Sequence, residues 1–168
     1  MTDSKKVDPP VAVIAVEVAP RAKPTTYPAL FAPVMEGREK RPLGEVFGLR
    51  NFGVNLTHIA PGGLSALRHA HAKQDELIYV LSGTALLSTD AGDATLTPGM
   101  CAGFRAGTGV SHQLINQGQE EFVYLEVGDR SDGDHVTYPN DDLVALYNNG
   151  VWQYLRKDGT SYTNGPKC

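Results

Sequence analysis

The chain has 168 residues, which suits one domain with a sizeable hydrophobic core and leaves little room for a second. With 41% hydrophobic residues, 20% charged residues and a net charge of −4, it is predicted to fold in water rather than to stay disordered. The negative charge and the lack of a long basic run argue against a nucleic-acid partner, because affinity for nucleic acid depends largely on cations paired with phosphates.

Two features of the sequence bear on where the protein resides. Cys101 and Cys168 are the only cysteines, so no disulfide framework is expected. The longest apolar run, residues 11–18, is too short to span a bilayer, contains Glu17 and lacks a signal-peptide cleavage site. We therefore expect a cytoplasmic protein that does not contact a membrane.

Residues 1–24 are expected to form an extended N-terminal arm ahead of a single domain over residues 25–168. Residues 11–18 are rich in β-branched side chains and predict a strand. This strand has few sequence neighbours to pair with and would expose an edge if left alone, so we expect it to mediate a homodimer. Five prolines between residues 19 and 45 exclude a long helix there and indicate an extended, wrapping segment.

From residue 52 onward, short β-rich runs alternate with turn residues. This spacing is typical of an all-β sandwich or barrel, and no helical period is present. One short helix is expected over residues 141–147, capped by Asn140 or Asp141. The predicted strands cover residues 52–59, 64–71, 76–81, 84–88, 94–96, 100–104, 112–116 and 121–127, followed by an extended stretch at 135–139 and a terminal hairpin of 151–156 and 160–163.

A group of histidines and one glutamate predicts a metal site. His69 and His71 lie two apart on a predicted strand, so both imidazoles point to the same face. The loop of residues 72–75 lets the chain turn back, so that Glu76 begins the neighbouring antiparallel strand. His112 begins a later strand and is the candidate fourth ligand. An isolated His-x-His pair is weak evidence for a metal, but the added glutamate and third histidine strengthen the prediction.

Three imidazoles and one carboxylate suit a divalent transition metal ion such as Mn, Fe, Ni, Zn or Co. On an octahedral ion, four protein ligands leave about two positions open for water or substrate. Side chains on the same strand faces as Glu76 and His112 are expected to line a substrate pocket. Arg105 precedes the loop that carries His112; it is either an exposed side chain or a contact for a carboxylate or phosphate. The other expected pocket residues are Ile78, Val80, Leu114 and Asn116.

The spacing of these residues resembles the first cupin motif without a gap. The motif reads Gly63, five residues, His69-x-His71, four residues, Glu76, six residues and Gly83. Such an uninterrupted match identifies the chain as similar to cupins over this stretch.

The sequence also resembles the second cupin motif, but it departs from that motif at two points. Arg105 stands where the family has a proline, and the loop before His112 is two residues longer than in the family pattern. We expect a longer loop over residues 106–111, with His112 keeping its role. The second motif is matched by Gly99, Gly107, His112 and Asn116. The chain also resembles a bacterial single-domain cupin group, described as sugar-phosphate-isomerase-like, at residues 52–56, 89–92, 101–103 and 138–142. This resemblance covers residues 25–163.

The resemblance implies a double-stranded β-helix, a jelly-roll barrel that holds the metal near its centre. It leaves the activity open, because this fold hosts isomerases, epimerases, dioxygenases, decarboxylases and non-catalytic sensors. Our leading hypothesis is a metal-dependent isomerase or epimerase that acts on a small polar substrate such as a sugar, sugar phosphate or sugar acid, with the ion as Lewis acid. The alternatives are an Fe(II)-dependent dioxygenase and a non-catalytic protein that binds a small molecule.

Overall fold

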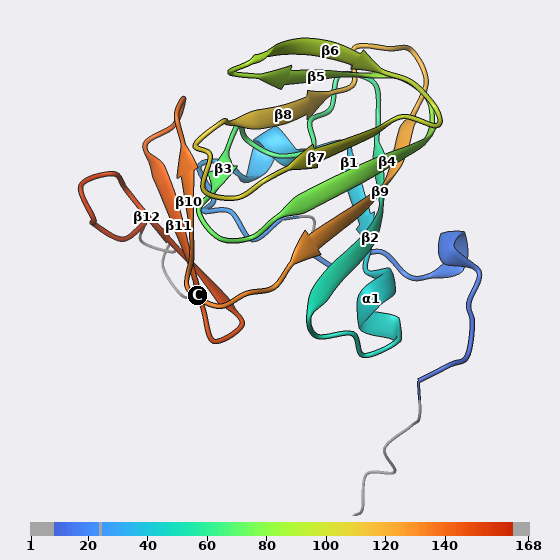
Figure 1. Ribbon diagram of the computed structural model, residues 1–168, viewed down its shortest axis with the longest axis horizontal. Helices are drawn as coiled ribbons and strands as arrows, with labels where there is room; N and C mark the ends of the chain where they lie inside the picture. The colour runs from blue at the N-terminus through green and yellow to red at the C-terminus, as the bar shows by residue number, and fades with distance from the viewer. Residues whose placement is uncertain (1–8, 24, 163–168) are drawn as a thin grey trace, which may run out of the picture.

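The computed structural model describes residues 9–23 and 25–162, and strands dominate this part of the chain. Twelve strands and only three short helical segments confirm the all-β prediction (Figure 1). None of these helical segments has the length and apolar character needed to cross a bilayer. The elements are η1 (Ala15–Glu17), η2 (Ala32–Met35), β1 (Arg38–Arg41), α1 (Leu43–Val46), β2 (Phe52–Ile59), β3 (Ala70–His71), β4 (Glu76–Ser82), β5 (Ala85–Thr89), β6 (Gly92–Leu96), β7 (Cys101–Phe104), β8 (His112–Ile115), β9 (Phe122–Asp129), β10 (Asp134–Tyr138), β11 (Leu143–Asn148) and β12 (Val151–Leu155).

The strands form three antiparallel sheets that surround a common interior. The largest has the order β1-β2-β9-β4-β7, the second β12-β11-β10-β3, and the third β6-β5-β8. Two isolated backbone bridges, Leu64 with Ile115 and His69 with His112, connect the chain just before β3 to β8. These bridges hold the second and third sheets together at the position where the predicted metal ligands lie.

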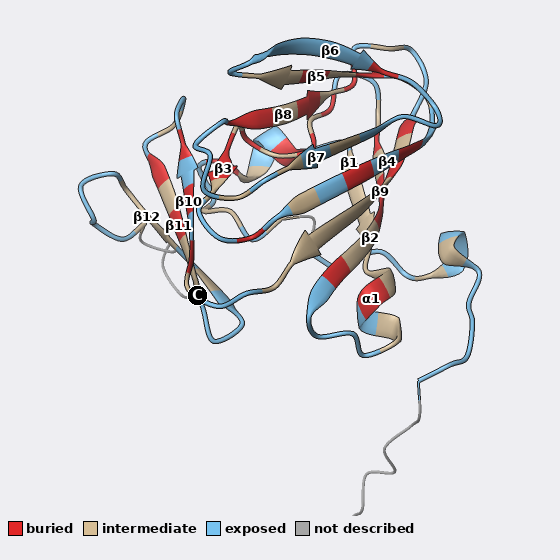
Figure 2. Cartoon of the chain, viewed as in Figure 1, coloured by how far each residue is buried: buried red, intermediate tan, exposed pale blue. Residues whose placement is uncertain are grey.

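Two clusters of apolar side chains pack in the interior. The buried stretches of the strands are red in Figure 2. The first lies between the largest and the three-stranded sheets, where Ile59, Val80 and Phe122 are fully buried. The second packs under β10 and β11, around Val136 and Leu143. Each such side chain contributes about 1.5–3 kcal/mol of hydrophobic free energy, so the two clusters hold the sheets in place around the site.

Two predicted elements are wrong. Residues 11–18 form the short 3-10 turn η1 inside an irregular, largely exposed segment, and no described strand pairs with them. β-Branched side chains favour a strand only where a neighbouring strand satisfies the backbone. Residues 141–147 contribute to strand β11 rather than a helix, because β10 and β12 pair with it on both sides. The predicted strand over residues 64–71 is also shorter and consists of β3 alone.

Gly83 occupies the turn that leads out of β4, and its conformation predicts a large mutational effect. Its φ is +73°, and a Cβ placed there would lie 2.3 Å from the carbonyl oxygen of Glu121 and 2.9 Å from the Cα of Phe122. Gly83→Ala is therefore expected to lower the free energy of unfolding by about 3 kcal/mol or more in denaturant titrations. Gly109→Ala is the matched control, because φ there is +74° but an added Cβ would meet nothing within 4 Å. It should cost about 1–2 kcal/mol, and equal losses would argue against the contact with Glu121.

Candidate metal centre

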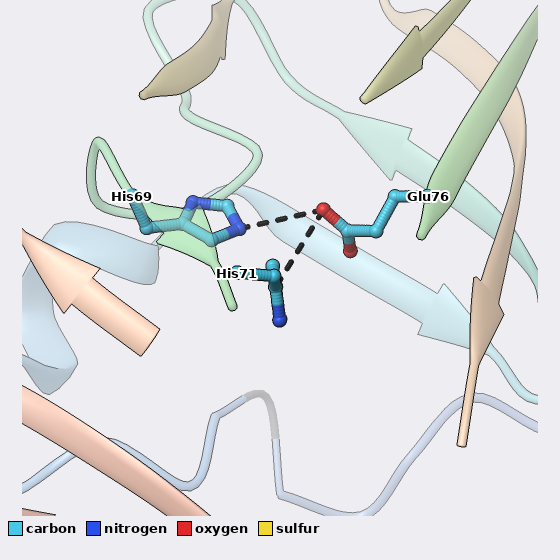
Figure 3. Close-up of side chains that lie close together, drawn as sticks. All are labelled: His69, His71 and Glu76. Carbon is cyan, nitrogen blue, oxygen red and sulfur yellow. Dashed lines mark ion pairs between the residues drawn. The ribbon is translucent and has the colours of Figure 1, made fainter. Parts of the chain in front are cut away.

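The histidines of the first motif lie at β3, and their imidazoles project toward the beginning of β4 (Figure 3). His69 immediately precedes β3 and His71 ends it, so alternation along the extended chain directs both rings to one side. Glu76 is the first residue of β4, on the far side of the loop, as its position in the sequence predicts. His112 begins β8, where two backbone hydrogen bonds of 3.1 and 2.9 Å pair it with His69.

The side-chain nitrogens of the three histidines surround one carboxylate oxygen. The distances from Glu76 Oε2 to the Nε2 atoms are 3.5 Å for His69, 3.6 Å for His71 and 3.1 Å for His112. Ligand atoms bound to one ion at about 2.0–2.2 Å lie about 3–3.6 Å from one another, so these spacings fit a transition-metal site. The ligand atoms of His69, His71 and Glu76 all lie within 4.8 Å of one another and make up a group that can hold a metal ion. His112 lies beside this group but outside it, so its role as the fourth ligand stays a prediction.

The outer nitrogens of two imidazoles are held by hydrogen bonds. His69 Nδ1 lies 2.8 Å from the carbonyl oxygen of Leu67, and His71 Nδ1 lies 2.5 Å from Oδ2 of Asp134. Carbonyl and carboxylate oxygens accept hydrogen bonds, so each Nδ1 is the protonated nitrogen in the neutral ring. With Nδ1 fixed in this way, loss of the proton from Nε2 turns its lone pair to the site, as a metal ligand requires.

Asp134 is a functional residue that the sequence analysis missed. It is only 1% exposed and accepts hydrogen bonds from the backbone N–H groups of Lys73 (2.7 Å) and Gln74 (3.4 Å) as well as from His71. Asp134 therefore fixes both the ring of His71 and the loop that leads to β4. A signal was present in the sequence, because Asp134 shares the period of two with the apolar residues Val136 and Tyr138, which indicates an inward-facing carboxylate.

The electrostatics of the centre favour charge on Glu76 and His71. Burial disfavours the ionised carboxylate of Glu76, but hydrogen bonds from His112 and His69 outweigh it and hold the pKa of Glu76 well below its usual value. Burial likewise opposes the charged form of His71, yet the hydrogen bond to Asp134 and the charge of Glu76 raise the pKa of His71. For His112, burial prevails over the hydrogen bond to Glu76 and lowers the pKa.

A cavity of about 930 Å³ opens beside the centre, and His69, His71, Glu76 and His112 all contribute to its wall. Ile78 and Leu114 line it with apolar surface. The volume lies within the range of small-molecule sites, and the walls combine apolar side chains with a few charged groups.

Three residues expected in the pocket lie elsewhere. Val80 is fully buried in the first apolar cluster, two residues further along β4 than Ile78. Asn116 follows the end of β8, and its amide donates hydrogen bonds of 2.8 Å to the carbonyl oxygens of Ile59 and Glu120, so it fixes a loop. Arg105 is exposed and is not part of the cavity wall.

Comparison with known proteins agrees with this architecture. A family model described as a cupin domain matches residues 55–128. The structure of a sugar phosphate isomerase from a cupin superfamily of Silicibacter pomeroyi superposes with a TM-score of 0.84 at 34% identity, covering 90% of this chain and 96% of that one. The chain belongs to the cupin superfamily. Its strand arrangement is the cupin jelly roll that the motif resemblance implies.

Two further structures are similar to this cupin. A proposed sugar phosphate isomerase from Acidithiobacillus ferrooxidans shares 31% identity with a TM-score of 0.67, over 84% of this chain and 97% of that one. A predicted oxalate decarboxylase from Thermotoga maritima shares 21% identity with a TM-score of 0.55, over 71% of this chain and 99% of that one, and this likeness concerns the fold alone. A search among curated proteins found no significant match.

The cavity of this cupin also has walls that the sequence analysis did not predict. One consists of aromatic residues from the second sheet and from the segment before β1. There the ring of Tyr27 lies edge-on to Tyr138 and Tyr154, at centroid distances of 5.8 and 5.6 Å. Another is polar and comes from β1, β2 and β9. Both walls depend on contacts between segments far apart in the chain, for which local periodicity carries no signal.

Proposed function

We propose that this cupin is a metal-dependent isomerase or epimerase that acts on a small polar molecule, namely a sugar, sugar phosphate or sugar acid. The observation that carries the proposal is the convergence of three imidazole nitrogens on one oxygen of Glu76 at the wall of an open cavity. The similarity to the Silicibacter and Acidithiobacillus proteins, which are described as sugar phosphate isomerases, supports the reaction class.

In this proposal His69, His71, Glu76 and His112 hold one divalent ion of the Mn, Fe, Ni, Zn or Co type. Such an ion supplies Lewis-acid chemistry when bound, because it polarises a substrate carbonyl and acidifies the neighbouring C–H. Asp134 keeps the Nε2 of His71 directed at the cavity. The apolar surfaces that flank the centre exclude water from the reacting end of the substrate.

The test combines metal analysis with a direct assay. Protein purified without added metal is analysed for bound elements, reloaded with each candidate ion, and incubated with aldoses, ketoses, their phosphates and sugar acids in D₂O. Isomerisation or epimerisation through proton transfer exchanges the hydrogen next to the carbonyl for deuterium, which proton NMR detects. Conversion or exchange without oxygen uptake supports the proposal. Oxygen consumption that accompanies turnover would favour a dioxygenase, and ligand-dependent stabilisation without any turnover would favour a binding protein.

We also propose that the N-terminal arm, residues 1–24, joins two copies of the chain in a homodimer. Its described part runs outside the body of strands in Figure 1, and Val11, Ile14 and Val16 are 102%, 61% and 60% exposed. The outer face of β4 carries a second set of exposed apolar side chains, in which Leu77 and Tyr79 are 46% and 43% exposed. Two such surfaces on one chain are typical of an interface between copies, because monomers rarely leave contiguous apolar patches in water.

Deleting residues 1–19 is expected to convert the dimer into a monomer of about half the mass in light scattering, because the deletion removes the apolar part of the arm. Deleting residues 1–8 alone is the matched control and should leave the dimer intact. The double substitution Ile14→Asp with Val16→Asp tests the same surface without shortening the backbone. A dimer that survives both the longer deletion and the double substitution would show that the arm is not the interface.

A further inference from the structure

A partly buried charged cluster lies on the inner face of the largest sheet, beside the metal centre but separate from it. Lys40 of β1 donates hydrogen bonds to both carboxylate oxygens of Glu126 on β9, at 2.8 and 2.7 Å. Asn55 of β2 donates a third hydrogen bond to the Oε1 atom of Glu126 at 3.1 Å. The side chains of Lys40 and Glu126 are only 19% and 17% exposed, and all three residues line the cavity.

The strand register places this cluster within reach of a molecule bound at the metal centre. On β4 and β9, Ile78 is opposite Glu126 and Glu76 is opposite Gly128. Glu126 is therefore a diagonal neighbour of Glu76 on the same inner face, and such neighbours are separated by about 7–8 Å. A ligand a few bonds long that contacts the metal centre with one end would reach the cluster with the other. Between the two, the sheet presents Ile78.

The free-energy cost of burying the Lys40–Glu126 ion pair argues against a purely structural role. Burying an ammonium and a carboxylate costs several kcal/mol for each ion, and apolar residues of similar size at such positions are often as stabilising or more so. On this face Ile78 lies opposite Glu126 across β4, and Arg38 and Tyr124 lie two residues from Lys40 and Glu126 on the same strands; all three line the cavity. Polar groups set beside apolar surface in a cavity wall fix the orientation of a bound ligand.

The chemistry of the cluster selects a neutral hydroxyl group. An ammonium has three N–H donors and a carboxylate about four acceptor positions, so the hydrogen bonds described leave capacity on both Lys40 and Glu126. A hydroxyl can accept from the first and donate to the second at the same time. An ionised phosphate or carboxylate group can only accept hydrogen bonds, and the negative charge of Glu126 would repel it.

We propose that Lys40, Glu126 and Asn55 form a hydroxyl-recognition site, which binds one hydroxyl or a vicinal pair on a polyol whose carbonyl end faces the metal centre. This inference rests on the proposed function for the identity of the reacting end. It adds that the end of the ligand nearest β1 and β9 is uncharged, so any phosphate or carboxylate group on the ligand lies elsewhere in the cavity.

Calorimetric binding to the zinc-loaded protein tests the inference without relying on turnover. The probes are free aldohexoses and aldopentoses, their terminal phosphates, and the monodeoxy derivatives of the sugar that binds best. The variant is Lys40→Met combined with Glu126→Leu, because removing both charges avoids a buried ion without a partner. Glu39→Gln is the matched control, since Glu39 is the adjacent residue on β1, belongs to the opposite face and forms its own ion pair with Arg41.

The wild-type protein should bind the best sugar about tenfold more tightly than one of its monodeoxy derivatives. The double variant should keep its zinc and its melting temperature, bind the sugar about tenfold more weakly, and no longer distinguish the two. Glu39→Gln should behave like the wild type. The inference is overturned if the wild type binds none of these polyols, or if the double variant retains both affinity and discrimination. Selective binding without isomerisation of any sugar would count against the proposed function and leave the recognition site in place.

Discussion

His71→Ala is expected to reduce bound metal from near one ion per chain to a small fraction, with at least about a 100-fold loss of metal affinity. The substitution removes the Nε2 atom that lies 3.6 Å from Glu76 Oε2 and also leaves the buried Asp134 without its imidazole partner. Elemental analysis of protein purified without added metal measures the occupancy. Any metal-dependent turnover should fall to the same extent.

His135→Ala provides the control for this prediction. His135 lies in β10, next to Asp134, but it is exposed and outside the cavity wall. Its replacement should leave the metal content unchanged. Full occupancy in the His71→Ala protein would show that the ion does not need the imidazole of residue 71.

Asp134→Asn is expected to weaken metal binding by about 10–100-fold and to lower the free energy of unfolding by about 2–4 kcal/mol. The amide keeps the shape of the carboxylate, but it lacks the charge that orients His71, and its single oxygen cannot accept from both His71 and the backbone N–H groups of Lys73 and Gln74. Metal titration and denaturant unfolding of the metal-free protein separate the two effects. Asp132→Asn is the control, because that side chain is exposed two residues before Asp134, and an amide oxygen can still accept from the backbone N–H of Asn149.

The stability difference between wild type and Asp134→Asn should depend on pH. Burial tends to raise the pKa of Asp134, but the hydrogen bonds from His71 and from the backbone of Lys73 outweigh it, so the pKa is lowered. A carboxyl with a lowered pKa in the folded state stabilises the protein above its unfolded pKa of about 3.9, and this contribution disappears as the pH falls through the folded value. The difference should therefore be full near neutral pH and shrink in acid. A difference that grew in acid would contradict the charged, hydrogen-bonded state of Asp134.

Features encoded by neighbouring residues could be predicted from the sequence. The bounds of β2 agree with the predicted strand over residues 52–59, because turn residues flank a run of β-formers. The shared direction of His69 and His71 follows from alternation along an extended chain, and the loop at residues 72–75 brings Glu76 to them. These relations need only short-range geometry.

Features that depend on distant contacts could not be predicted in the same way. Residues 141–147 have a composition that also suits a helix, and pairing with two neighbouring strands decides their structure. The cavity wall joins Lys40 to Glu126, which are 86 residues apart, so no local pattern links them. Asp134 is 63 residues from His71, so no local pattern predicts the hydrogen bond between them either.

The raised pKa of His71 beside the ionised Glu76 has a consequence for how the centre fills. A protonated imidazole cannot coordinate a cation, so a divalent ion that binds here must displace a proton from His71, whose pKa is raised. Metal binding is then a competition between the divalent ion and a proton for the lone pair of the His71 imidazole. A lower pH would therefore weaken the binding of a divalent ion at this centre, and uptake of such an ion would release protons into the buffer.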